Sequence, residues 1–362
     1  MKLSKFPYLV QTEILDNMKY SNLFLLSFLS TNMKTLIKSS QIMRFKNIIR
    51  LMYQSDIGDK RIASILFKTK NVMGEDTLGM GDIMGIFDHH MESKNDCFQL
   101  NVSGEMIDFR LSNQRNLPEA CFHPSERESA IESIHNYFLD FFGDTMDYIW
   151  GANNPEHFIP NLPNLSVWVT SWPESSEAID MKSLEKFFAS SPVLKHLHIK
   201  LTTKEVLSPE SKFYQVESIK IVQPLPKTVN ALLRHFQGRQ ATLFFCEIEV
   251  LPLIEFMNRW ISGEAFQKLE YLKIILLSND IALNEVLNVN GLKHIDATKT
   301  PPAHTVANVY TPTLKQNTDP IITHTYVVRK TDNRVASVSI QEGDFVFGVW
   351  NETEEEFLTM VK

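Results

Sequence analysis

The chain has 362 residues, of which 43% are hydrophobic and 22% are charged. This composition is typical of a globular protein and excludes wholesale disorder. The length exceeds what one hydrophobic core usually organises, so two or three structural units are expected. The three cysteines, Cys97, Cys121 and Cys246, lie far apart and include no Cys-x-x-Cys pair, which disfavours a disulfide scaffold and a zinc finger.

Charge is unevenly distributed along the chain. The net charge is −7, but residues 34–70 contain nine Lys or Arg and two Asp, which gives this segment +7 and leaves −14 for the remainder. A basic segment on an acidic chain favours an acidic partner. A solvated helical face explains the same pattern equally well.

Residues 6–40 are predicted to form three short helices. Ser21 is placed to cap the second helix and Thr31 to cap the third. The second helix contains the run LFLLSFL at 23–29 and is apolar nearly all round. A unit of about 40 residues cannot bury that much apolar surface alone. This helix is therefore expected to pack against the rest of the chain or against a partner.

A membrane or export role of the same run is disfavoured. Its seven residues are far fewer than the roughly 20 that span a bilayer. Glu13 and Asp16 precede it, and no small-residue cleavage site follows closely, which is untypical of a signal peptide. We expect an intracellular protein, cytoplasmic or nuclear, that binds no membrane.

Residues 46–160 are predicted to be a mixed α/β connecting region. Strands are expected at 61–67 and in a hairpin at 97–111. A helix is expected to begin at a capping box at 125–128 and to end at Gly143.

A phrase of the form L-x-x-L-x-I recurs over residues 161–299, at 162–167, 194–199, 216–221, 243–248, 269–274 and 292–297. Its spacing averages 26 residues, and helical segments separate the copies. A strand followed by a helix at this period is typical of leucine-rich repeats (LRR). An LRR-like parallel sheet is therefore predicted, with an ordinary α/β domain as the alternative.

The repeated phrases also suggest a binding surface. Their apolar residues face the core, and the alternating residues face outward. Stacked parallel strands would place these outward residues in two rows, one of His196, Ser218, Tyr271 and His294 and one of His198, Lys220, Lys273 and Asp296. Repeat sheets commonly bind partners through such rows, so the histidines, lysines, Tyr271 and Asp296 are the candidate target-binding residues. A merely solvated sheet face is the alternative.

The C-terminal part is predicted to be a loop and a β-meander. Residues 300–323 are rich in Pro and Thr, and 324–351 contain strands at 325–330, 334–340 and 344–350 before a solvated acidic tail. The expected fold class is α/β, or α+β overall, with three N-terminal helices, an LRR-like strand and helix domain, and this antiparallel meander.

The sequence contains no recognisable catalytic motif. G-x-S-x-G, H-E-x-x-H and the P-loop pattern are all missing. The stretch GMGDIMG at 79–85 has the wrong spacing for a dinucleotide loop and is expected to be a flexible loop. Asp88-His89-His90 with Cys97, and His196 with His198, are weak metal-site candidates beside the commoner reading as surface residues. We predict a non-catalytic protein without cofactor or metal.

The N-terminal segment resembles an F-box. The places of that motif are occupied by Phe6-Pro7, Ile14-Leu15, Asn22-Leu23 and Leu36-Ile37. The stretch at 30–38 is similar to the version found in the large nematode F-box families, although the Trp often found in the third helix is absent. The resemblance implies that residues 5–45 bind a Skp-type adaptor through Phe6, Pro7, Leu9, Ile14, Leu15, Leu23, Leu26, Leu36 and Ile37.

Two later stretches resemble the F-box-associated type 2 domain. Residues 246–274 are similar to its F-L-x-x-W-I-x-G…L-E-Y-L core, and residues 326–350 are similar to its terminal segment that ends in F-x-F-x-V-W. Asn333 stands where that family usually has a turn Gly. The resemblance implies that residues 161–351 form this domain.

Together the resemblances imply a substrate-recognition subunit of a Skp–cullin–F-box (SCF) ubiquitin ligase. Its partners would be a Skp-type adaptor, through it a cullin, and a target protein. A non-ligase protein-interaction scaffold with an LRR-like domain is the alternative. A nucleic-acid binder, suggested by the basic segment, is third, because interleaved aromatic residues on a recognisable platform are lacking.

Overall fold

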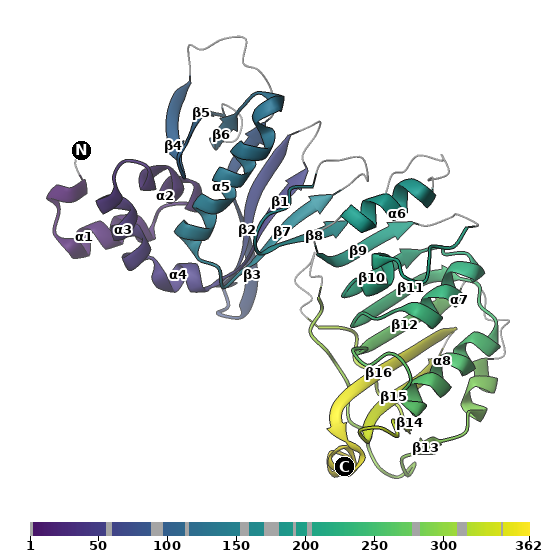
Figure 1. The fold of residues 1–362 in the computed structure, drawn as a ribbon. Coiled ribbons are helices and arrows are strands. Elements are labelled where there is room, and N and C mark those ends of the chain that lie inside the picture. Colours follow the sequence, from purple (N-terminus) through teal and green to yellow (C-terminus); the bar gives the residue numbers. More distant parts are fainter. Residues whose placement is uncertain are drawn as a thin grey trace. The chain divides into compact units, whose positions relative to one another are not determined.

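The computed structural model describes residues 3–55, 60–87, 97–112, 116–152, 159–169, 181–190, 193–200, 205–276, 283–309, 317–341 and 343–362 (Figure 1). The chain divides into two compact units. Unit 1 comprises residues 1–152 and 158–166, and unit 2 comprises residues 153–157 and 167–362.

Unit 1 begins with the expected helices. They are the 3-10 turn η1 (Leu3–Lys5), α1 (Tyr8–Asp16), α2 (Tyr20–Ser27), α3 (Thr31–Ser40) and the short α4 (Ile42–Lys46). The three predicted helices are confirmed, but two caps differ. Lys19 precedes α2 without a side-chain cap, and the Ser30 hydroxyl, rather than Thr31, accepts the N–H of Met33 at the start of α3.

Seven strands and one long helix complete unit 1. In spatial order the strands are β7 (Asp147–Ala152), β1 (Ile48–Ser55), β2 (Arg61–Lys70), β3 (Asp76–Phe87), β6 (Pro118–Cys121), β5 (Glu105–Leu111) and β4 (Phe98–Val102). The helix α5 (Arg127–Phe142) lies beside the sheet and ends at Gly143, as predicted (Figure 1). Its entry differs, because His123 and Glu126 form the capping box of the 3-10 turn η2 (Pro124–Glu126) before it.

The expectation of a flexible loop at 79–85 is wrong. These residues belong to β3, which pairs with β2 in a long antiparallel hairpin. Glycine is needed at Gly79, since a Cβ there would lie 2.6 Å from Cε2 of the Phe67 ring. Gly79 therefore serves close packing within a strand, which sequence spacing alone did not indicate.

Unit 2 contains four whole parallel strands, and all but the first two residues of a fifth, joined by helical crossovers. They are β8 (Leu165–Val169), β9 (Leu194–Lys200), β10 (Ser218–Val222), β11 (Gln240–Cys246) and β12 (Tyr271–Leu276). The crossover segments are α6 (Met181–Ser190), η3 (Lys212–Gln215), α7 (Pro226–His235) and α8 (Val250–Ser262), and the three α-helices line one face of the sheet (Figure 1). The mixed α/β class is confirmed, while the leucine-rich-repeat character stays a prediction. Two phrases were out of register with their neighbours, because Val167 pairs with Leu194, and Gln240, which precedes the phrase at 243–248, pairs with Ser218 and Tyr271.

The meander extends the sheet of unit 2 beyond β12. Its strands are β14 (Thr325–Val328), β15 (Arg334–Gln341) and β16 (Asp344–Thr353), and β16 pairs antiparallel with β12. Asn333 lies between β14 and β15 with φ 58°, a conformation that Asn tolerates. After η4 (Leu283–Asn288), the three-residue strand β13 (Leu292–His294) pairs with β14 at the far edge. The acidic tail is not merely solvated, since α9 (Glu354–Thr359) buries Phe357.

The Pro/Thr-rich loop crosses one face of this sheet. Its described residues 301–309 and 317–322, here called the strap, are held together by bridges between His304 and Ile321 and between Ala307 and Asn317. His304 Nε2 lies 2.9 Å from the Val349 carbonyl oxygen. The strap approaches β16 so closely that a Cβ at Gly348 would lie 2.5 Å from Cδ1 of Ile321. The strap therefore occupies part of the face that lacks the α-helices.

Candidate protein-binding surfaces

The inner faces of the N-terminal helices are built into the core of unit 1. Leu15, Leu23, Phe24 and Ile37 are each 0% exposed. The Phe24 ring packs on that of Phe138 in α5, with 5.3 Å between centroids. The apolar second helix is thus covered by its own chain, one of the two possibilities expected from its composition.

Aromatic and polar contacts join α2 and α3 to α5. The ring of Phe28 stacks on that of Tyr137 with 4.3 Å between centroids, and the Ser27 and Tyr137 hydroxyls are 2.7 Å apart. Lys34 forms an ion pair with Asp140, and Lys38 Nζ lies 3.0 Å from Asp140 Oδ1. The hydrogen bond from Lys34, and then that from Lys38, lowers the pKa of Asp140. Part of the basic segment therefore already has an acidic partner within the chain.

Arg44 holds the turn between α1 and α2. Its Nη1 donates to the carbonyl oxygens of Leu15 and Asp16, each at 3.1 Å, and its Nη2 donates to that of Met18 at 3.0 Å. The guanidinium also lies 4.6 Å from the centre of the Tyr20 ring. One cation thus satisfies the carbonyl oxygens at the end of α1.

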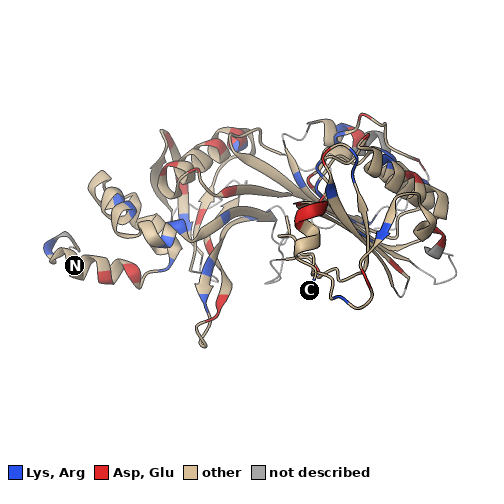
Figure 2. Ribbon diagram, turned by 90° about the horizontal axis from the view of Figure 1, so that it is seen from below, with Lys and Arg blue, Asp and Glu red and all other residues tan. Residues whose placement is uncertain are grey.

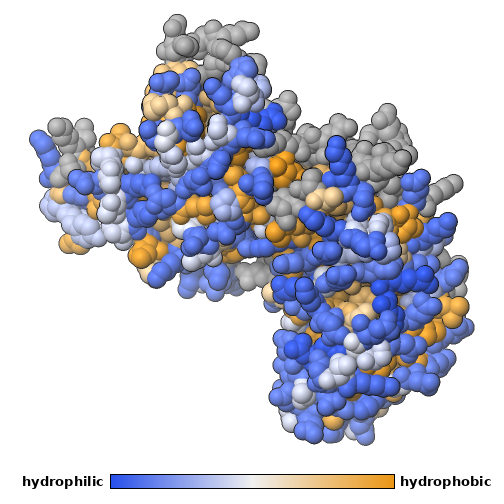
Figure 3. Space-filling model, viewed as in Figure 1, coloured by the Kyte–Doolittle hydropathy of each residue, from blue (hydrophilic) through white to orange (hydrophobic). Residues whose placement is uncertain are grey.

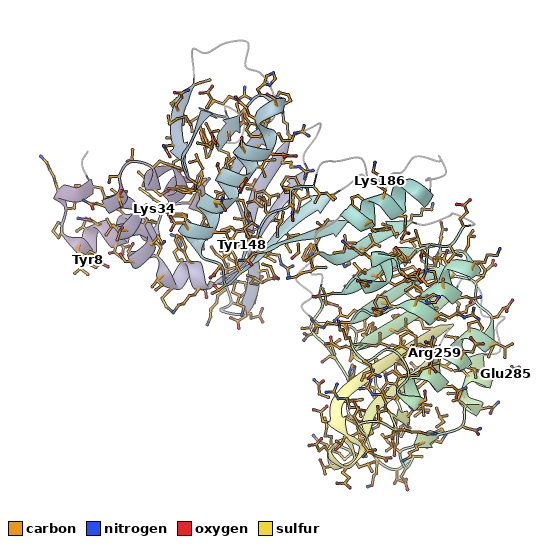
Figure 4. All side chains as sticks on the ribbon, viewed as in Figure 1. Tyr8, Lys34, Tyr148, Lys186, Arg259 and Glu285 are labelled. Atoms are coloured by element: carbon orange, nitrogen blue, oxygen red, sulfur yellow. The ribbon has the colours of Figure 1, made fainter. Side chains whose placement is uncertain are left out.

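The outer face of α1 remains exposed and apolar. Tyr8, Leu9 and Val10 are 58%, 80% and 40% exposed, and they follow the exposed Pro7. Orange apolar surface is visible over the N-terminal helices in Figure 3, and Figure 4 places Tyr8 on α1 at the end remote from α5. Three consecutive large apolar residues in solvent are costly for an isolated protein, so this face is a candidate docking surface.

The predicted adaptor-binding residues divide by burial. Leu15, Leu23 and Ile37 are buried, whereas Phe6, Ile14, Leu26 and Leu36 are half-buried and Pro7 and Leu9 are exposed. Tyr8 and Val10 were not among the predicted contacts. The signal for them was the run Pro7–Val10, in which consecutive apolar residues cannot all lie on the one buried stripe of a helix.

The two predicted rows on unit 2 are partly present. Strand register places His196, Ser218 and Tyr271 in one row, with Gln240 completing it on β11. The second row runs through His198, Lys220, Thr242 and Lys273, as the same registers show. Both rows lie on the face opposite the residues that pack against α7 and α8.

His294 and Asp296 do not continue these rows. β13 pairs with β14, and β14, β15 and β16 separate it from β12. His294 pairs with Thr325, and Asp296 follows the strand and accepts the N–H of Thr298 through Oδ1 at 2.8 Å. The phrase at 292–297 matched the repeat pattern, but it belongs to the antiparallel edge of the sheet.

Much of the first row is inaccessible. His196 is 0% exposed and Tyr271 is 5% exposed, and burial raises the pKa of Tyr271. The strap covers Gln240, whose side-chain amide donates to the carbonyl oxygen of Ala307 at 2.6 Å. In the second row, Lys273 Nζ lies 3.1 Å from Asp344 Oδ2. Burial, and then the charge of Lys220, lowers the pKa of His198.

The described residues do not support the two metal sites that the sequence suggested. Asp88-His89-His90 lies outside the described residues. The rings of His196 and His198 have centroids 6.5 Å apart. Within the part of the chain that the structure describes, there is no cluster of three or more His, Cys, Asp or Glu side chains placed to hold a metal ion.

Comparison with known families identifies the N-terminal helices. Residues 3–45 match the F-box domain. This segment is an F-box. It spans η1 to α3 and most of α4, and its presence suggests an SCF adaptor-type role through Skp binding. No curated protein and no solved structure matches the chain. Among the described residues no helix has the length and apolar character of a membrane span.

The burial of the F-box residues leads to a prediction about the isolated segment. We expect residues 1–45 alone to be poorly ordered, because Phe24 then loses the aromatic cover of α5, and too little apolar area remains to offset chain entropy. Circular dichroism should show little helix, with a gain when a Skp adaptor is added. A stable, cooperative fold of the free segment would contradict this expectation.

Proposed function

We propose that this chain is the substrate-recognition subunit of an SCF ubiquitin ligase. Its F-box binds a Skp-type adaptor, which links it to a cullin, and the C-terminal domain binds a target protein. The observation that carries the proposal is the F-box at 3–45, whose helix α1 keeps Tyr8, Leu9 and Val10 in solvent while its other helices fill the core. In this assembly the ubiquitin-transfer chemistry belongs to other subunits.

The exposed face of α1 suits an adaptor surface. Aromatic and aliphatic anchors at the centre of an interface usually carry most of its binding energy. Leu9, at 80% exposure, has most of its apolar area still to bury. Each square ångström of apolar area removed from water contributes about 25 cal/mol, so covering this face is favourable. The buried Leu15, Leu23 and Ile37 then support α1 from behind.

We also propose that residues 161–351 form an F-box-associated type 2-like domain. Two observations support this assignment. The two resembling stretches are neighbours, because β12 from the first pairs with β16 from the second. Trp260 of the first stretch also packs edge-on against Phe347 of the second, with 5.2 Å between ring centroids. The two stretches therefore contribute to one packed core.

The adaptor contact can be tested with Leu9→Asp. The change adds a carboxylate to an exposed position, so the free chain should keep its unfolding midpoint. Burying that charge unpaired in an apolar interface costs several kcal/mol, and adaptor affinity should fall about a hundredfold. The measurement is titration of purified chain with a Skp adaptor, beside pull-down of the cullin.

Leu251→Asp is the matched control, since Leu251 is 69% exposed on α8 in unit 2. This variant should leave adaptor binding unchanged. Undiminished binding by Leu9→Asp would place the adaptor elsewhere. Recovery of the adaptor without a cullin would favour the non-ligase scaffold.

A further inference from the structure

A groove opens in unit 1 between the F-box and the β2–β3 hairpin. Its volume is about 1000 Å³, and it is lined by the α1–α2 turn, the end of α4 and the facing edge of the hairpin. Lys and Arg positions on both the F-box helices and the hairpin are visible in Figure 2. The groove lies apart from the exposed residues Tyr8 to Val10, which are not part of its lining.

The hairpin forms a well-supported wall of this groove. At its tip, the Asn71 side-chain oxygen accepts the N–H groups of Met73 and Glu75, each at 2.9 Å. On the adjoining part of β2, the N–H of Lys68 donates to the Asn47 carbonyl oxygen at 2.9 Å, which joins this strand to the end of α4. A wall that is hydrogen-bonded within its turn and to α4 loses little entropy when a ligand binds.

The charged side chains of the lining are mostly cationic. Lys19, Arg44, Lys68 and Lys70 line the groove, and Asp82 is the one acidic side chain among the lining residues. Asp82 already accepts a hydrogen bond from the Ser64 hydroxyl at 2.7 Å. Within the described residues, Lys19, Lys68 and Lys70 have no carboxylate within 4.0 Å. Three ammonium groups are therefore available to a ligand.

Apolar surface and a helix start complete the groove. Met80 is 63% exposed on the hairpin side, and the Tyr20 and Phe67 rings lie 5.3 Å apart between their centroids. Lys19, Tyr20 and Ser21 place the N-terminus of α2 in the lining, where no side chain caps it. The N–H groups there favour an anion. A ligand with both carboxylates and an apolar side chain matches this lining.

We propose that this groove binds an acidic peptide segment of a partner protein, with carboxylates on Lys68, Lys70 and Lys19 and an apolar side chain against Met80. The partner's status as the ligase target rests on the proposed function, but peptide binding itself does not. The groove is accessible, whereas the sheet face of unit 2 has His196 and Tyr271 buried. Charge complementarity of this kind speeds association and selects against basic partners.

The test uses arrays of ten-residue peptides in which Glu alternates with varied aliphatic or aromatic residues. Matched arrays carry Gln or Lys in place of Glu. Full-length chain should bind the Glu arrays at least tenfold more tightly than the Gln arrays, and raised salt should weaken binding because exposed ion pairs are screened. The Lys68→Glu/Lys70→Glu variant should lose at least tenfold in affinity for the best Glu peptide.

Lys227→Glu/Lys268→Glu supplies the control, because both lysines are exposed in unit 2 and the net charge change is the same. A second variant, Met80→Ser, should weaken binding of peptides with large apolar residues while leaving the unfolding midpoint unchanged. Equal binding of Glu and Gln arrays, or full binding by Lys68→Glu/Lys70→Glu, would overturn the proposal. Adaptor binding measured on the same variants reports separately on the proposed function, and it should remain unchanged.

Discussion

Leu23→Asp should unfold unit 1. Leu23 is 0% exposed in the cluster that α2 shares with α5 and the unit 1 sheet. An unpaired carboxylate at such a site costs several kcal/mol, which is comparable to the whole stability of a typical domain. Hydrogen exchange should show loss of protection in β1, β2 and α5, while the strands of unit 2 keep theirs.

Leu29→Asp is the informative control for this prediction. Leu29 follows α2 and is 71% exposed, so the same chemical change should cost little stability there. Leu23→Asp should also abolish adaptor binding, but through unfolding of the F-box support rather than loss of a contact. A Leu23→Asp chain with normal protection in unit 1 would show that this packing is wrong.

Trp260→Ala should destabilise unit 2 by roughly 3–5 kcal/mol, the usual cost of removing a large buried aromatic side chain. Trp260 is 0% exposed and contacts Phe347 and the Arg329 guanidinium, whose carbon lies 5.1 Å from the centre of the indole ring. Arg329 is itself 1% exposed and paired with Asp332, so the mutation also removes the cover of a buried cation.

Urea unfolding followed by hydrogen exchange in β12 and β16 measures this loss. Leu251→Ala on the same helix is the control, because Leu251 is 69% exposed and its truncation should change stability little. Unchanged stability of Trp260→Ala together with loss of target binding would mean that Trp260 serves recognition rather than packing.

Several elements were predictable because their signals are local. The helices at 8–16, 20–27 and 31–40 follow from the spacing of their apolar residues, which acts within one or two turns, although the capping residues of the second and third helices were not predicted correctly. The turn at Asn333 follows from the tolerance of Asn for positive φ. The F-box motif depends on residues within the single segment 3–45, so its pattern is complete in the linear sequence.

The candidate surfaces were less predictable because they depend on distant residues. The sequence indicated that the apolar second helix needed cover, but not that Phe138 in α5 would pack on its Phe24 ring. The L-x-x-L-x-I pattern predicted that His294 lies beside Tyr271 on the parallel strands. Strand pairing instead places His294 in β13, at the antiparallel edge of the sheet. The burial of Tyr271 depends on tertiary packing that no local pattern encodes.

The sequence by itself determined the F-box, the alternation of strands and helices after residue 160, and the meander, since periodicity and turn residues act over short distances. Only the tertiary structure decided which apolar faces stay in solvent. It buried Leu15 and Ile37, exposed Leu9, and brought Lys19, Lys68 and Lys70 to the lining of one groove. The physical reason is that burial depends on which distant segment completes a surface, and that partner is chosen by the packing of the whole unit.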